Sequence, residues 1–171
     1  MAALQAVLEG APSYAERVTG HPPGAADAQG MYTILPPEIG YDDKFVWGVE
    51  LDGELVGCID VIRGWPQPDI SHLGLLLIDE AHTGQGLGRA AYEELEAQVR
   101  RWPGIRHLRA AVVATNDDVL GFWLRMGFSK TGETKPYRYD KLVSETIILT
   151  KPLNTSHEGR AVGALPTPRD T

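Results

Sequence analysis

Apolar residues at helical spacing predict that the chain opens with two short helices. Leu4, Val7 and Leu8 form one stripe within residues 2–18, and glycine and proline at residues 10–12 interrupt the helix before a second turn. The next segment, residues 20–41, is dense in glycine, proline and alanine. This composition predicts a substrate-side loop with a short helix, or a mobile lid.

Residues 44–78 show the patterns of β-strands. The Asp52-Gly53 pair separates two runs rich in β-branched and aromatic residues, 44–51 and 55–62, which is typical of a tight hairpin. The apolar run 70–78 predicts a third strand, buried on both faces. Three antiparallel strands therefore precede the glycine-rich run that follows them.

The second half of the chain mixes helix and strand patterns. Apolar residues from Leu87 to Trp102 recur at near-helical spacing, and Pro103-Gly104 ends the helix that they predict. A strand, a short helix and a final pair of strands are expected at residues 108–114, 116–127, 128–135 and 144–149. Tyr137 and Tyr139 fall in the loop expected between the last two strands.

Composition limits the class of protein. A chain of 171 residues with 43% hydrophobic and 23% charged residues predicts one soluble globular domain over residues 1–153, and the polar segment 154–171 predicts a disordered tail. No apolar run is long enough to cross a membrane, and the first residues lack the pattern of a signal peptide. We therefore expect a cytoplasmic protein that does not bind membranes.

Charge and cysteine usage narrow the chemistry. The net charge of -7 disfavours binding to nucleic acid and mildly favours cationic partners such as amines. Cys58 is the single cysteine, so we expect neither an internal disulfide nor a metal cluster, and no metal cofactor. Its place in an apolar run predicts a small buried side chain rather than a catalytic thiol.

A glycine-rich loop is the strongest chemical signal. The run Thr83-Gly-Gln-Gly-Leu-Gly-Arg89 lies between the third predicted strand and the long helix. Glycines let the backbone approach a ligand closely, and the free N–H groups at a helix start form an anion site suited to a pyrophosphate. A tight turn without a ligand is the alternative interpretation.

A dinucleotide-binding enzyme is a further alternative, because Gly86-Leu-Gly88-Arg-Ala-Ala91 fits the G-x-G-x-x-A fingerprint. That fingerprint follows the first strand of a repeated parallel unit, with an acidic residue about twenty positions further on. Here a hairpin comes first, and residues 106–109 are not acidic. The context therefore disfavours a nucleotide-dependent oxidoreductase.

Two motifs in register resemble those of the GNAT family of N-acetyltransferases. Residues 76–89 resemble the family's acetyl-CoA signature, Q/R-x-x-G-x-G/A preceded by a strand, and Asn116 with Phe122-Trp-Leu-Arg-Met-Gly-Phe128 resembles its later motif. The resemblance covers residues 44–153. It implies an α/β (α+β) fold, with a mixed, mostly antiparallel twisted sheet, a central splay and helices on both faces.

The resemblance also implies acetyl-CoA as cosubstrate, bound in the splay between strands that end near Ile78 and Ala114. The implied cofactor-binding residues are Leu76, Ile78, Thr83, Gly84, Gln85, Gly86, Leu87, Gly88, Arg89, Asn116, Phe122 and Trp123. Thr83 departs from the family, which usually has arginine or glutamine there. Trp123 stands where many members have a tyrosine that protonates the leaving thiolate.

Transfer to an amine needs a proton acceptor, because an alkyl ammonium with a pKa of about 10 is mostly protonated at neutral pH. His72 is the favoured base, since it shares the strand parity of Leu76 and Ile78 and a histidine pKa of about 6.5 suits the role. A solvent-facing histidine is the alternative. Glu50 and Asp60 on the hairpin are the fallback carboxylates.

The remaining roles follow from the resemblance. Tyr139 and Tyr137 are candidate proton donors to the thiolate, or surface aromatics, and the backbone N–H of Ile78 is the expected oxyanion donor. The acceptor, an amine of a small molecule or a peptide, would be selected by residues 14–41. The resemblance to the family also implies that a homodimer is possible. A non-catalytic acyl-CoA-binding or sensing module is the main alternative, favoured by Thr83 and Trp123.

Overall fold

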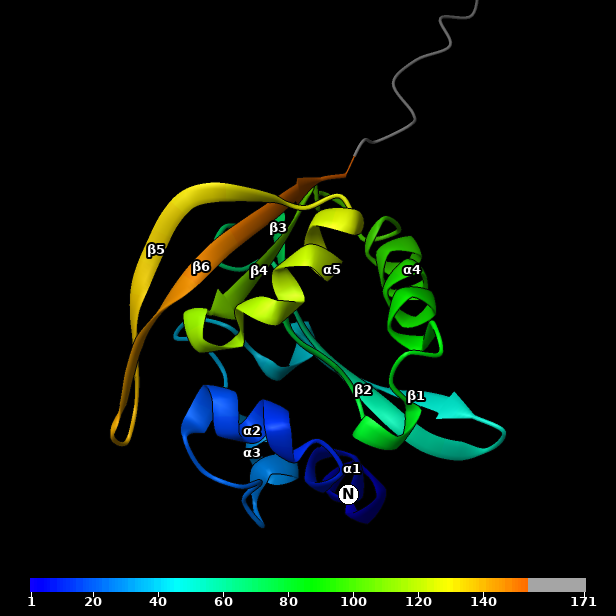
Figure 1. Cartoon of the computed structure of the whole chain (residues 1–171). Coiled ribbons are helices and arrows are strands. Elements are labelled where there is room, and N and C mark those ends of the chain that lie inside the picture. The colour runs from blue at the N-terminus through cyan, green and yellow to red at the C-terminus, as the bar shows by residue number, and fades with distance from the viewer. Residues whose placement is uncertain (154–171) are drawn as a thin grey trace, which may run out of the picture.

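The computed structural model describes residues 1–153, and the predicted tail, residues 154–171, lies outside this range. Six strands form one sheet in the order β1-β2-β3-β4-β6-β5 (Figure 1). The strands are β1 Lys44–Leu51, β2 Glu54–Arg63, β3 Ile70–Ile78, β4 His107–Val113, β5 Ser129–Tyr139 and β6 Leu142–Pro152. The helices are α1 Ala2–Glu9, α2 Pro12–Thr19, α3 Asp27–Thr33, α4 Leu87–Val99 and α5 Leu120–Arg125, with short 3-10 helices η1 Tyr41–Asp43, η2 Glu80–His82 and η3 Ala114–Val119.

Two antiparallel halves of the sheet meet at a short parallel seam. β1, β2 and β3 pair antiparallel on one side, and β4, β6 and β5 pair antiparallel on the other. The seam consists of the pairing of Ile70–Leu73 in β3 with His107–Ala110 in β4. Beyond the seam these two strands diverge, which confirms the splay implied by the family resemblance.

Helices cover both faces of the sheet, each over its own apolar core (Figure 1). The larger core joins α4 and α5 to the sheet, and the smaller core joins α1 and α3 to β2 and β3. The predicted stripe of Leu4, Val7 and Leu8 is buried in the smaller core. Cys58 is fully buried there too, and burial raises the pKa of its thiol to about 12, so it acts as a small apolar side chain.

A bulge in β3 lies where the seam ends. Asp60 of β2 is opposite Leu75, whereas the next residue, Val61, is opposite Leu73. Gly74 is therefore an extra residue in β3. A side chain at Gly74 would begin 3.4 Å from the carboxylate of Asp60, so the bulge brings the β3 backbone close to that group.

The bulge changes the face on which β3 side chains lie. Leu73 and Leu76 both pack against the larger core, although they are three positions apart, and Leu75 and Leu77 face the smaller core. His72, which precedes Leu73, lies on the side of the smaller core. The parity that the sequence suggested between His72 and Leu76 is therefore wrong, because one inserted residue shifts the alternation of the strand.

The predicted order of elements is confirmed within residues 1–153, and three elements differ from the prediction in length. α4 ends at Val99, and Trp102 reaches the larger core from the turn that follows. β5 and β6 are longer than predicted, so Tyr137 and Tyr139 belong to β5 rather than to a loop. Pairing with β6, which shifts register between Lys130 and Thr134, extends this exposed ribbon despite its polar sequence.

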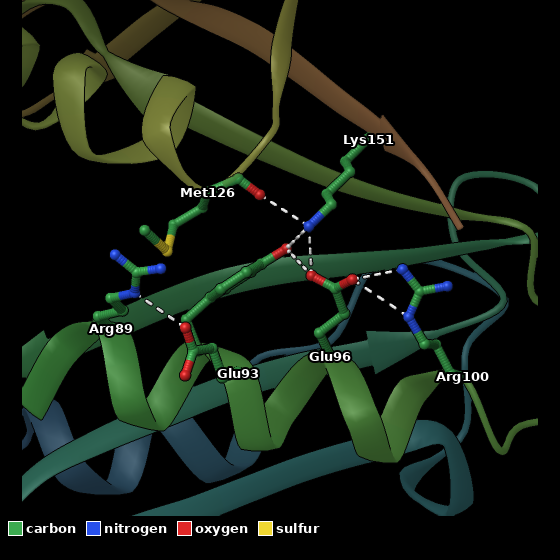
Figure 2. A network of polar contacts seen from close by, with 7 residues as sticks. Arg89, Glu93, Glu96, Arg100, Met126 and Lys151 are labelled. Atoms are coloured by element: carbon green, nitrogen blue, oxygen red, sulfur yellow. Dashed lines mark hydrogen bonds and ion pairs between the residues drawn. The ribbon is translucent and has the colours of Figure 1, made fainter. Parts of the chain in front are cut away.

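A largely buried polar network fixes α4 against β6 (Figure 2). The ammonium of Lys151 donates to the main-chain carbonyl of Met126 at 2.7 Å and to the hydroxyl of Tyr92 at 3.1 Å, and it forms an ion pair with Glu96. Arg100 pairs with the same carboxylate at 2.5 Å. The side chains of Lys151 and Glu96 are only 18% and 14% exposed. This network anchors the helix that begins at the glycine loop.

Candidate active site

A cavity of about 510 Å³ opens where β3 and β4 diverge, with further walls from α2 and α5. The backbone N–H of Asp79 donates to the carbonyl of Val56 at 2.9 Å, which makes these two an antiparallel hydrogen-bonded pair. Alternation along β3 then turns the N–H and C=O groups of Leu76 and Ile78 away from β2 and toward the cavity. An extended ligand would meet these groups as an added strand does.

The glycine loop forms one border of this cavity. Gly84 and Gly86 have φ values of 76° and 81°, in the left-handed region that favours glycine. α4 begins with the half-buried Leu87, and within residues 1–153 no side chain caps its N-terminus. A side chain on Gly88 would contact Phe122 across the cavity. Backbone N–H groups and the positive end of the α4 dipole thus remain available to an anion.

The side chains of the loop contribute less to the cavity than its backbone. Gln85 and Arg89 are exposed, and Arg89 pairs with Glu93 at 2.8 Å on the surface of α4 (Figure 2). The hydroxyl of Thr83 borders the cavity and donates to the carbonyl of Glu80 at 3.1 Å. The threonine hydroxyl is therefore engaged within the loop.

Asn116, Phe122 and Trp123 lie together on the opposite wall. Asn116 departs from helical geometry, with φ -114° and ψ 35°, and its side-chain oxygen accepts a hydrogen bond from Arg17 at 3.4 Å. Trp123 is buried and packs edge-on against Tyr92 in the larger core. This indole supplies apolar contact to the wall, and it offers no phenol that could donate a proton.

α2 connects the two halves of the sheet across the cavity. At its start, the backbone N–H of Ser13 donates to the carboxylate of Glu80, next to β3, at 2.8 Å. At its end, the hydroxyl of Thr115, next to β4, donates to the carbonyl of Arg17 at 2.5 Å. Tyr14 projects from this helix into the cavity wall. Sequence reasoning missed Tyr14 as a site residue, because an aromatic residue in a short helix carries no motif.

A second cavity of about 810 Å³ shares Tyr14 with the first. Its walls come from α2, α3 and the loop after α3 on one side, and from β1, β2 and β3 on the other. Most of the lining is apolar, and the polar side chains include Lys44, Asp60, His72 and Tyr139. Two adjoining cavities suit a reaction in which two substrates meet.

Asp60 is the carboxylate that the structure places beside both cavities. It lines the second cavity, and its carboxylate lies next to Gly74 in the wall of the first. Oδ2 accepts from the ammonium of Lys44 at 2.7 Å, while Oδ1 is buried and has no hydrogen-bond partner in the described part of the chain. Burial raises the pKa of Asp60 above its usual range, although Lys44 opposes the effect.

His72 also lines the second cavity, but its environment differs from that of a free histidine. Nδ1 lies 3.0 Å from Nη1 of Arg109, and the ring of Trp65 packs edge-on against the imidazole. Burial and the charge of Arg109 lower the pKa of His72 to about 3. The imidazole is therefore neutral and weakly basic at neutral pH.

The other proposed catalytic residues are spread more widely. Glu50 is exposed in β1 and borders neither cavity. Tyr139 is 48% exposed at the second cavity, and Tyr137 donates its hydroxyl to the carbonyl of Val18 at 2.5 Å. Burial raises the pKa of Tyr14 above its usual value, with Tyr137 adding to the effect.

Two further properties concern metals and membranes. Among residues 1–153, no three histidine, cysteine, aspartate or glutamate side chains are grouped so that they could hold a metal ion. None of the helices in that range combines the length and apolar character needed to cross a membrane.

This geometry is that of an α+β protein in which two parallel strands of one sheet diverge and leave a cavity that fits an extended ligand. The model of the acetyltransferase (GNAT) family matches residues 14–128, and the chain belongs to that family. Its sequence is 29% identical over 89 residues to "Probable N-acetyltransferase 14" of Danio rerio. That match covers 52% of this chain and 31% of the relative, so the chain spans about a third of that protein.

Solved structures share the fold. An acetyltransferase from Thermus thermophilus superposes with a TM-score of 0.66 and 27% identity, over 89% of this chain and 90% of that one. A GNAT family acetyltransferase from Elizabethkingia anophelis, determined with acetyl-CoA bound, superposes with a TM-score of 0.55 and 15% identity, over 66% of this chain and 78% of that one. The second likeness concerns the fold alone.

Proposed function

We propose that this protein is an acetyl-CoA-dependent N-acetyltransferase that moves the acetyl group to a primary amine by direct attack. The observation that carries the proposal is the cavity in the splayed sheet, bordered by the glycine loop and joined at Tyr14 to a second cavity. Family membership supports acetyl-CoA as the donor. The second cavity would hold the acceptor.

Main-chain groups would do most of the binding of acetyl-CoA. The C=O of Leu76 and the N–H and C=O groups of Ile78 would pair with the amides of the pantetheine arm. The N–H groups of residues 84–89 would hold the pyrophosphate at the start of α4. Asn116 and Phe122 would flank the arm from the other strand.

The reaction forms a C–N bond, breaks the C–S bond and releases one proton from the attacking amine. Asp60 is the best-placed acceptor of that proton, because its carboxylate lies beside both cavities and burial makes it more basic. His72, with a pKa of about 3, is a weaker base. The backbone N–H of Leu76, which lies nearer to the seam than Ile78, is the candidate donor to the oxyanion.

The leaving group needs little help, because a thiol pKa of about 8.5 makes the thiolate a tolerable leaving group. Tyr14 would donate a hydrogen bond to it, since the raised pKa of this phenol disfavours full proton transfer. Tyr139 borders only the second cavity, so we place it with the acceptor rather than with the thiolate.

Calorimetric titration with acetyl-CoA and with NADPH tests the donor, and a thiol-release screen over amines tests the transfer. We expect binding of acetyl-CoA alone, and release of CoA thiol in the presence of one class of amine. Binding of acetyl-CoA without release by any amine would instead support a non-catalytic acyl-CoA sensor. Failure to bind acetyl-CoA would contradict both functions.

A further inference from the structure

A polar cluster in the second cavity has no role in the transfer step. His72 in β3 and Trp65 in the turn before β3 line that cavity, and Arg109 in the adjacent strand β4 contacts His72 without lining it. Nη1 of Arg109 lies 3.0 Å from Nδ1 of His72. The indole of Trp65 orders both partners, with its ring centroid 5.2 Å from the guanidinium carbon and 4.9 Å from the centroid of the imidazole.

The contact with Arg109 sets the hydrogen-bonding role of His72. A guanidinium group carries only donors, so Nδ1 of the imidazole must be the acceptor. A neutral imidazole then carries its proton on Nε2. Within residues 1–153, the side chain of His72 forms hydrogen bonds only with Arg109, whose backbone raises the pKa of the imidazole while burial and the charge of Arg109 lower it. His72 therefore offers the second cavity one N–H donor, polarised by the cation behind it.

Arg109 brings a positive charge that needs a counter-ion. Arg109 is only 7% exposed, and within residues 1–153 it forms no ion pair with a carboxylate, although the charge of Glu133 opposes the lowering of its pKa by burial. The other cation in this region, Lys44, is already paired with Asp60. Asp27, on the α3 side of the cavity, accepts from a backbone N–H at 2.8 Å. A buried guanidinium without a counter-ion is costly, so an anion bound in the cavity would be favoured.

Most of the remaining cavity lining is apolar. Much of this wall comes from α2, α3 and the loop after α3, and its apolar members include Val18, Met31, Ile34, Leu35 and Pro36. A bound molecule can therefore bury a hydrocarbon group there while a polar end reaches His72. Asp60 lies on the same side of the sheet, in the neighbouring strand β2.

We propose that the acceptor is a free amino acid with an apolar side chain. Its carboxylate accepts a hydrogen bond from Nε2 of His72, with Arg109 supplying the positive charge behind. Its side chain occupies the apolar wall, and its amine is directed to Asp60. The assignment rests on the proposed function, because only a transferase makes this cavity an acceptor site.

The test compares ligands that differ only in the carboxylate. Leucine, leucine amide, 3-methylbutylamine and the dipeptide leucylglycine are titrated into the protein saturated with CoA, and each is then assayed for thiol release with acetyl-CoA. We expect leucine to bind and react at least tenfold better than the other three, since none of them has a carboxylate on the carbon that carries the amine.

Two variants test which residues bind the carboxylate of leucine. Arg109→Met removes the charge and His72→Phe removes the donor, and both should raise the KM for leucine about tenfold or more while acetyl-CoA binding stays unchanged. Arg109→Lys should restore part of the affinity. His107→Gln is the matched control, because His107 lies two residues away in β4, is half exposed and pairs with Asp69 instead.

The outcomes separate the two proposals. Equal reaction of leucine, its amide and 3-methylbutylamine, or equal losses for all of them in Arg109→Met, would refute the carboxylate site and leave the transferase intact. A preference for leucylglycine would point to a peptide N-terminus and also refute it. Binding of leucine without thiol release would keep the carboxylate site and contradict the transferase.

Discussion

The carboxylate of Asp60 has two oxygens in different environments. Oδ2 is neutralised by Lys44, whereas Oδ1 is buried with no partner among residues 1–153. An unsatisfied buried carboxylate oxygen costs stability, and such costs recur at sites where a ligand completes the hydrogen bonding. Oδ2, which lies nearest to Gly74 in the wall of the first cavity, is the oxygen that the amine of the proposed reaction would approach.

Asp60→Asn tests this role, because asparagine keeps the shape and loses the basicity. We expect kcat to fall about 100-fold or more, with little change in acetyl-CoA affinity. Wild-type kcat should decline as the pH falls through the raised pKa of Asp60, and that decline should be absent in the variant. Glu50→Gln, at an exposed carboxylate outside both cavities, should keep its rate; the reverse pattern would make Glu50 the base.

The lowered pKa of His72 has a consequence for stability. Below a pH of about 6.5 the unfolded chain takes up a proton at His72, whereas the folded protein does not until the pH approaches 3, so folding stability is lost as the pH falls. Relative to His72→Gln, the wild type should lose about 2 kcal/mol of unfolding free energy between pH 7.5 and pH 5. Urea unfolding of both proteins at both pH values measures this change. If the wild type and His72→Gln differ by the same free energy at pH 7.5 and at pH 5, the pKa of His72 is not lowered.

Single residues also show where sequence reasoning reached its limit. The sequence could propose roles for the glycines of the loop and for Asn116 because those roles depend on local backbone geometry, which a motif records. The roles of Asp60, His72 and Tyr14 depend on partners from other elements, namely Lys44, Arg109 and the opposite cavity wall. A histidine and its guanidinium neighbour 37 positions later leave no local pattern in the chain.

In the proposed function the loop before α4 binds acetyl-CoA through its backbone, so the role of its glycines can be tested separately. Gly86 has a φ of 81°, and a side chain there would meet nothing within 4 Å, so Gly86→Ala adds strain without a clash. We expect a loss of about 1–2 kcal/mol of stability and at least tenfold weaker acetyl-CoA binding. Calorimetry measures the binding.

Gly104 provides a matched control, because it has a φ of 80° and an equally open surrounding in the turn after α4. Gly104→Ala should lose a similar amount of stability and keep its affinity for acetyl-CoA. Equal weakening of acetyl-CoA binding in both variants would mean that general destabilisation, and not the loop, controls binding.

The network around Lys151 sets the position of α4. Lys151→Met should cost about 3 kcal/mol, because it leaves the carboxylate of Glu96 and the carbonyl of Met126 without their shared donor in a mostly buried place (Figure 2). Arg89→Met removes the exposed pair with Glu93 on the same helix and should cost less than about 1 kcal/mol. Equal losses in urea unfolding would show that burial of the network is unimportant.

Helices and strands were predicted well where the sequence pattern depends on residues close together in the chain. The Asp52-Gly53 hairpin and the apolar stripe of α1 depend on neighbours in sequence, and both are confirmed. The bulge at Gly74 and the length of β5 depend on pairing with distant strands. Strand alternation assumes an uninterrupted ladder, so one inserted residue was enough to place His72 on the wrong face.

At the scale of the whole molecule, the two halves of the sheet are held together at both ends of the first cavity. The seam joins them along β3 and β4, and α2 joins them through Glu80 and Thr115. The splay itself was inferred from the family resemblance, since nothing in the local sequence of β3 or β4 predicts where two paired strands separate. The second cavity was not predicted, because it exists only once α3 packs beside the sheet.

The shortness of the seam bears on the order in which the protein folds. The hairpins β1–β2 and β5–β6 join neighbouring segments, whereas the seam must close a loop that contains all of α4, which carries a larger entropic cost. We therefore expect the hairpins to form early and β3 to join β4 late. Pulse-labelled hydrogen exchange during refolding should protect the amides of both hairpins before those of the seam, and simultaneous protection would contradict this order. The ligand opening between β3 and β4 would then be among the last features of the native state to appear.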